Sequence, residues 1–140
     1  MYRRILLAYD GSEGAKRALE AGINLAKLHR AELWALAVEE KLPRFSATID
    51  EVQEEKEFAN HHYSKLLTAA REQAAQAGVE LKTLLHPGHA AQTILQVARE
   101  GRFDLIVVGH SGLSGVWAMF LGTTAEKVSR HAPCSVLIVR

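Results

Sequence analysis

The residues with the clearest potential for chemistry lie between Val108 and Thr124, where glycines and hydroxyl side chains follow a short apolar run. The run from Leu105 to Val108 is typical of a strand buried on both faces, and we expect it to stop at Gly109. Beyond it, Gly112 and Gly115 permit a positive φ and a close approach of the backbone to a ligand. Several amide N–H groups can then point at one anion, so this stretch predicts a phosphate-binding cradle.

A helix start is predicted directly after Gly122. Thr123 and Glu126 have the spacing of a capping box, in which two side chains satisfy two unpaired N–H groups of a helix N-terminus. Such an N-terminus carries a partial positive charge. An anion bound in the cradle would therefore also lie near the positive end of this helix.

The rest of the chain alternates between strand and helix patterns. Strands are expected over 5–9, 32–38, 79–85, 105–108 and 135–139, and helices follow residues 10–12, Thr48, the turn at 86–88 and Gly122. This alternation predicts an α/β fold, a three-layer sandwich around a parallel sheet of about five strands. The polar connection 39–50 is longer than most in such folds, and we expect it to act as a lid.

Composition narrows the classes of partner. A chain of 140 residues with net charge +1 predicts one domain spanning 1–140 and gives no electrostatic reason for nucleic-acid or membrane binding. The single Cys134 excludes an intrachain disulfide and suits a reducing compartment. No apolar run approaches the roughly 20 residues of a membrane span, and the N-terminus lacks a signal-peptide pattern. We therefore expect a cytoplasmic protein.

Three motifs, in order along the whole chain, resemble the universal stress protein A family in its ATP-binding branch. They are the opening 5–12, the series Gly109, Gly112 and Gly122 followed by Thr123, and the close 131–139. The resemblance implies a five-stranded parallel sheet of Rossmann-like topology with strand order 3-2-1-4-5. That order would bring Asp10 and Gly109 together at the carboxyl ends of neighbouring strands, where α/β folds bind ligands.

The resemblance further implies ATP in this crevice, with magnesium assisting. It assigns to the nucleotide Ala8, Tyr9, Asp10, Val38, Val108, Gly109, His110, Gly112, Gly122, Thr123 and Thr124, and no catalytic residue. Asp10 would hold a ribose hydroxyl or a magnesium-bound phosphate, and Val38 would pack on adenine. Three alternatives stay open: Asp10 as a helix cap, the glycines as a tight turn without ligand, and Val38 as ordinary core.

One departure from the family concerns phosphate charge, because no lysine or arginine stands between Gly109 and Gly122. Backbone N–H groups, hydroxyls, a divalent metal and His110 would have to meet a triphosphate. The chain also lacks the Gly-Lys-Ser/Thr loop of NTPases. We therefore expect a nucleotide-dependent sensor or switch with at most slow hydrolysis. A slow ATP-hydrolysing enzyme and a nucleotide-free interaction domain remain alternatives.

The resemblance also implies a homodimer through the last strand. In the implied strand order, 136–139 lies at a sheet edge with unpaired backbone groups, and two such edges can pair about a two-fold axis. Trp117, Met119 and Phe120 form an apolar group that could serve the lid, a subunit contact or the core.

Overall fold

The computed structural model describes residues 1–40, 48–112 and 119–140. Its elements are β1 (Arg4–Ala8), α1 (Glu13–His29), β2 (Glu32–Glu39), α2 (Ile49–Gln76), β3 (Leu81–Pro87), α3 (Ala90–Glu100), β4 (Leu105–Gly109), α4 (Thr123–His131) and β5 (Ser135–Val139). Most of the predicted lid, together with Gly115 and Trp117, lies outside the described residues.

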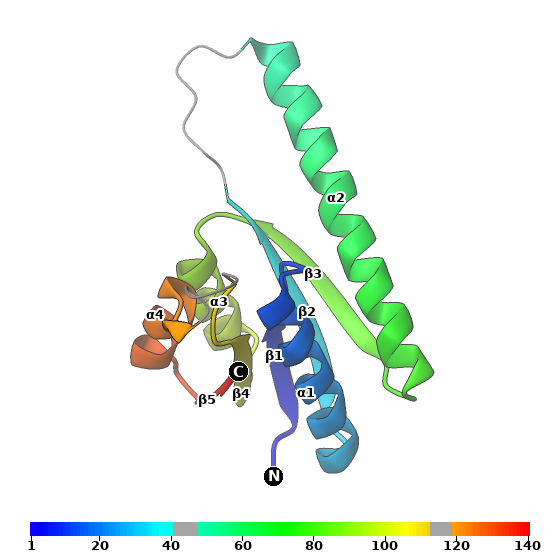
Figure 1. Cartoon of the computed structure of the whole chain (residues 1–140), viewed down its shortest axis with the longest axis vertical. Coiled ribbons are helices and arrows are strands. Elements are labelled where there is room, and N and C mark those ends of the chain that lie inside the picture. The colour runs from blue at the N-terminus through cyan, green and yellow to red at the C-terminus, as the bar shows by residue number, and fades with distance from the viewer. Residues whose placement is uncertain (41–47, 113–118) are drawn as a thin grey trace.

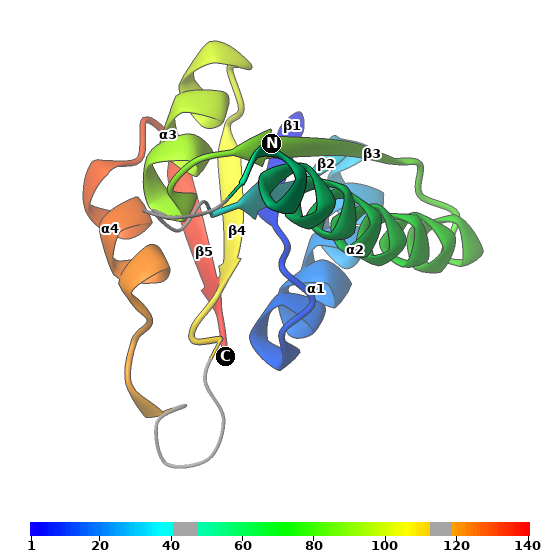
Figure 2. The same ribbon diagram turned by 90° about the horizontal axis from the view of Figure 1, so that it is seen from above.

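The sheet confirms the predicted architecture. Its five strands run in the order β3-β2-β1-β4-β5, and every neighbouring pair is parallel. The helices α1 and α2 cover one face and α3 and α4 the other, with β1 central (Figure 1, Figure 2). The carboxyl ends of β1 and β4 are therefore adjacent, as the strand order requires.

Alternation along the strands divides the core into two layers. In β1, Ile5 and Leu7 pack with α1 and α2, whereas Leu6 packs with α3 and α4. All four residues of the predicted buried run 105–108 are at most 3% exposed, which confirms that β4 is covered on both faces.

Several strand boundaries differ from the sequence prediction by one or two residues. β3 begins at Leu81 and runs through Pro87, so the predicted turn at 86–88 is partly strand. Proline fits there because β3 is an edge strand, and a missing N–H at an edge need not break a ladder bond. β1 ends at Ala8, so Tyr9 lies just beyond the strand.

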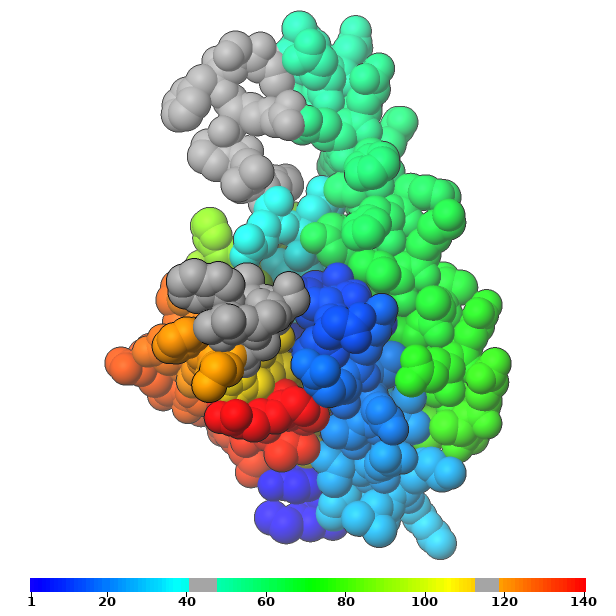
Figure 3. Space-filling view, in the orientation of Figure 1, coloured from blue at the N-terminus to red at the C-terminus, as the bar shows by residue number. Residues whose placement is uncertain are grey.

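The helix α2 is much longer than the sheet face that it covers. It begins with a capping box, because Thr48 Oγ1 accepts from the Glu51 N–H at 3.2 Å and the Glu51 carboxylate accepts from the Thr48 N–H at 3.3 Å. The first half of the helix projects beyond the body (Figure 1, Figure 3), and the second half buries Leu67, Ala70 and Ala74 against the sheet. Within the described residues, no helix is long and apolar enough to cross a membrane.

Candidate functional site

The turn after β1 places Asp10 at the carboxyl end of the central strand. Asp10 Oδ1 accepts from the Ser12 N–H at 2.9 Å, while Ser12 Oγ accepts from the Ala15 N–H at 3.2 Å. Ser12 is thus the N-cap of α1, and the interpretation of Asp10 as that cap is wrong. The Asp10 side chain is exposed and holds the turn with one oxygen.

The segment that leaves β4 meets this turn. A Cβ built on Gly112 would lie 3.7 Å from Ser12 Oγ and 3.9 Å from Asp10 Oδ2, which is ordinary van der Waals contact. Two segments a hundred residues apart in sequence therefore share one small site. The predicted positive φ at Gly112 is wrong, because the described glycines with positive φ are Gly11, Gly78 and Gly88.

Gly109 has a role that the sequence did not reveal. Its missing side chain makes room for α1, because a Cβ there would lie 2.7 Å from both the carbonyl carbon and the oxygen of Gly14. A Cβ on Gly14 would in turn lie 2.2 Å from the Ser111 carbonyl oxygen. The first turn of α1 is thereby seated directly against the end of β4, where its N-terminal N–H groups face the crevice region.

His110 joins three parts of the site through its backbone. Its N–H donates to the Val139 carbonyl at 2.7 Å, and its carbonyl accepts from the Gly122 N–H at 2.8 Å. These bonds anchor the start of α4 beside the end of β4. The helix N-terminus is where it was predicted, but the capping box at Thr123 is wrong. Gly122 is the N-cap with φ −65° and ψ 152°, and Thr123 is already the first helical residue.

The remaining predicted residues fall into two groups. Tyr9 and Val108 are 7% and 2% exposed, so they can offer a ligand little besides backbone groups. Ala8 and Val38 are half-buried against the α3–α4 core. Thr124 is half-buried, whereas Thr123 is exposed at the helix start. For Val38, core packing is therefore present, and a contact with adenine stays a prediction.

Two α2 residues, Leu66 and Tyr63, also lie near the turn after β1. Leu66 lies over the β1–α1 turn, since a Cβ on Gly11 would approach its Cδ2 to 2.8 Å. Burial raises the pKa of the Tyr63 phenol, and the negative charges of Asp10, Glu39 and Glu40 raise that pKa further. The Tyr63 hydroxyl therefore lies within the electrostatic influence of the carboxylates that follow β1 and end β2.

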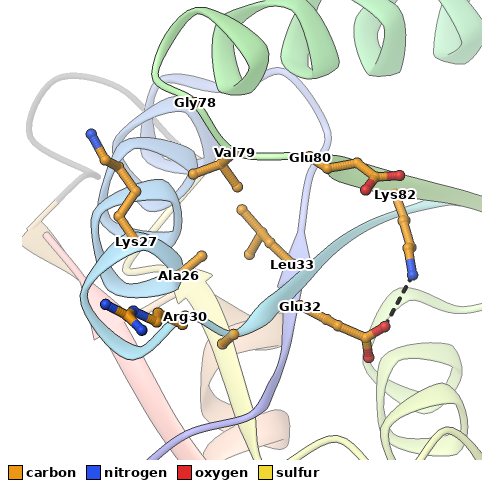
Figure 4. Close-up of a pocket in the computed structure, with 10 residues that line it drawn as sticks. Ala26, Lys27, Arg30, Glu32, Leu33, Gly78, Val79, Glu80 and Lys82 are labelled. Carbon is orange, nitrogen blue, oxygen red and sulfur yellow. Dashed lines mark hydrogen bonds and ion pairs between the residues drawn. The ribbon is translucent and has the colours of Figure 1, made fainter.

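A hollow lies at the other end of the sheet, beside the amino-terminal ends of β2 and β3 (Figure 4). Lys27 and Arg30 stand on its α1 side, and the Lys82 ammonium pairs with Glu32 at 3.0 Å on the other side. The Lys82 hydrogen bond, together with Arg4 on the same carboxylate, lowers the pKa of Glu32. None of the predicted nucleotide residues lines this hollow.

The comparisons with known proteins decide the family. The family model described as the universal stress protein family matches residues 1–140. The chain belongs to the universal stress protein family. It is 39% identical to universal stress protein YxiE of Bacillus subtilis, with both chains covered in full.

Solved universal stress proteins share this fold. UspA from Lactobacillus plantarum superposes with a TM-score of 0.89 at 30% identity, covering 99% of this chain and 98% of the other. A universal stress protein solved in complex with cAMP superposes with a TM-score of 0.77 at 26% identity, covering 99% and 97%. The Rossmann-like sheet is thus that of a universal stress protein.

Proposed function

We propose that this universal stress protein binds an adenine nucleotide in the crevice between the carboxyl ends of β1 and β4. The observation that carries the proposal is the meeting of Asp10, Ser12 and Gly112 at the point where the strand order reverses. Open α/β sheets bind ligands at such switch points. The cAMP complex of a universal stress protein with the same fold supports the choice of an adenine nucleotide.

Each side of the crevice suits one part of a nucleotide. Within the described residues the Asp10 hydrogen bond is made through Oδ1, and its second carboxylate oxygen, Oδ2, is a good acceptor for ribose hydroxyls. On the other side, α4 begins at Thr123 with no side-chain cap bond, so its first N–H groups remain for a phosphate. The backbone of 108–112 and the Thr123 and Thr124 hydroxyls complete the proposed phosphate contacts.

Magnesium fits this site only together with phosphate. Among the described residues, no group of three or more His, Cys, Asp or Glu side chains could hold a metal ion. Asp10 could supply one carboxylate oxygen, and Mg²⁺ commonly takes its other ligands from substrate phosphates and water. Bound in that way, the ion would offset phosphate charge.

The proposed role of nucleotide binding is that of a switch in a stress response. The phosphate side offers backbone and hydroxyl groups, and the stretch between Gly109 and Gly122 brings no lysine or arginine for a developing phosphoryl charge. Occupancy would then change conformation or assembly, and turnover would be slow. A dedicated enzyme would need groups that this stretch lacks.

Isothermal titration calorimetry with AMP, cAMP and Mg-ATP tests the site. We expect binding of at least one of them to the wild-type protein. Replacing Asp10 by alanine should weaken it about tenfold or more, because a hydrogen bond to a charged group is lost. Glu80→Ala is the control, because Glu80 lies at the amino-terminal end of β3, away from the proposed site. This variant should bind the nucleotide as the wild type does. Absence of binding to the folded wild type by all three would refute the proposal.

We also propose that the protein forms a homodimer through β5, which is an edge strand. The Val139 carbonyl accepts from His110, so the backbone groups of Val139 face β4. Backbone groups of successive strand residues face opposite edges, and those of Ile138 therefore point outward. Edge groups of this kind can pair antiparallel with a second copy.

Replacing Ile138 by proline should convert the dimer into a monomer. Proline removes the outward N–H but leaves the bonds between β4 and β5 in place. Light scattering at tens of micromolar measures the mass. The matched variant Leu137→Pro removes an inward N–H and should lower the melting temperature of the protein instead. A monomeric wild type at this concentration would contradict the proposed dimer.

A further inference from the structure

The crevice carries negative charge on its β1–β2 side. Asp10 follows β1, Glu39 is the last residue of β2, and Glu40 follows it. Because β1 and β2 are parallel neighbours, these residues share one end of the sheet, and their negative charges add to the effect of burial in raising the pKa of the Tyr63 phenol. Three carboxylates from two neighbouring strands thus act on one point beside the proposed nucleotide site.

Backbone N–H groups hold two of these carboxylates. Glu40 Oε1 accepts from the Ala90 N–H at 3.3 Å, which holds it at the start of α3. Asp10 Oδ1 is held by its bond to the Ser12 N–H. The Glu39 carbonyl accepts from the Gly88 N–H at 3.0 Å, which ties the end of β2, and with it the position of this residue, to the turn after β3.

Lys16 is a described cation that acts near this negative charge. Lys16 acts on Tyr9, where it lowers the pKa that burial raises, but its ammonium pairs with Glu13 at 3.4 Å. The stretch from Gly109 to Gly122 adds no lysine or arginine. Attraction for phosphate thus comes mainly from N–H groups at the α4 start, which are partial charges of short range.

We propose that the crevice selects adenine nucleotides by phosphate charge and binds cyclic AMP and AMP more tightly than metal-free ATP. The inference rests on the proposed nucleotide site and adds the ligand class that this site prefers. Metal-free ATP carries about three more negative charges than cyclic AMP near neutral pH. Each added charge is repelled by the three carboxylates, while the backbone N–H groups can serve only the phosphate nearest to them.

Repulsion between charges has a signature that loss of a contact lacks. Salt screens it, so raising the ionic strength should strengthen ATP binding and leave cyclic AMP binding nearly constant. Magnesium should act in the same direction, because it neutralises part of the triphosphate charge. An ordinary basic phosphate site would behave in the opposite way and lose ATP affinity with salt.

Calorimetric titrations with cyclic AMP, AMP and ATP, in EDTA and at about 0.02 M and about 0.5 M potassium chloride, test the inference. At low salt we expect cyclic AMP to bind about tenfold more tightly than ATP, with AMP between them. At high salt the ratio should fall to about threefold or less. Saturating Mg²⁺ at low salt should likewise reduce the ratio between the cyclic AMP and ATP affinities.

The variant Glu39→Gln tests whether the Glu39 carboxylate contributes to the weaker binding of ATP. It removes one charge while keeping the shape of the side chain, and it should tighten ATP binding about threefold at low salt and change cyclic AMP binding little. Glu80→Gln removes one charge at the amino-terminal end of β3 and should change neither the ATP affinity nor the cyclic AMP affinity. Circular dichroism of both variants confirms that they are folded.

The outcomes separate the two proposals. If the folded protein binds none of the three nucleotides, the proposed function fails and this inference fails with it. If ATP binds at least as tightly as cyclic AMP at low salt without magnesium, the nucleotide site stands and the charge selection is refuted. A ratio that is unaffected by salt and by Glu39→Gln also refutes it, because the preference would then come from fit.

Discussion

Replacing Gly14 by alanine is expected to lower the free energy of unfolding by about 2 to 4 kcal/mol. The added Cβ would lie 2.2 Å from the Ser111 carbonyl oxygen and 3.2 Å from its carbonyl carbon. Both atoms belong to the backbone, so relief requires that α1 move away from the end of β4. Urea denaturation followed by circular dichroism measures the change.

Gly22 in the same helix gives the matched control. A Cβ there would lie 3.5 Å from Leu33 Cδ1, which is normal packing. Gly22→Ala should therefore stabilise the protein by about 0.5 to 1 kcal/mol, because alanine is the better helix former. Equal urea midpoints for the wild type and the Gly14 variant would show that α1 and β4 do not touch as described.

Replacing Gly122 by valine is expected to weaken nucleotide binding at least about 100-fold while the protein remains folded. The backbone tolerates a side chain there, because φ is −65° and a Cβ would lie 3.4 Å from the His110 oxygen and 3.5 Å from Ser111 Cα. Branched methyl groups at this N-cap would instead crowd the first N–H groups of α4, where we place the phosphate. Calorimetry with cyclic AMP measures the loss.

Gly122→Ala is the graded control. Its single methyl group should reduce nucleotide affinity less than valine does. Both variants should lower the free energy of unfolding by no more than about 2 kcal/mol, because only the helix cap is altered. Normal binding by a folded Gly122→Val protein would show that the phosphate site lies elsewhere.

The layers and the strand order were predictable from the sequence, but by different routes. The apolar run 105–108 and the helix stripes indicated which faces are buried, because side-chain periodicity reports burial directly. Periodicity does not say which strands are neighbours. The order 3-2-1-4-5 came from the family resemblance, and the structure confirms it.

The details of the candidate site were harder to predict because they depend on segments remote in sequence. Nothing in the first turn of α1 signals that Gly14 must fit against Gly109 and Ser111, a contact made only after folding. Likewise, the spacing of Thr123 and Glu126 suits a capping box, but the N-cap is Gly122, whose N–H bonds to His110. The proximity of Tyr63 to three carboxylates was not predictable either, because Asp10, Glu39 and Glu40 are remote from it in sequence.

The central position of β1 has a consequence for synthesis of the chain. β1 leaves the ribosome before β4, and the Arg4 N–H donates to the carboxylate of Asp104, which lies 100 positions later, just before β4. At about 5 to 20 residues per second, one edge of β1 therefore waits roughly 5 to 20 seconds for its neighbour. During that time a strand whose Ile5, Leu6 and Leu7 end fully buried has no partner on that side. Nascent chains of this protein should accordingly engage chaperones until β4 emerges, and release from them should mark the closing of the sheet.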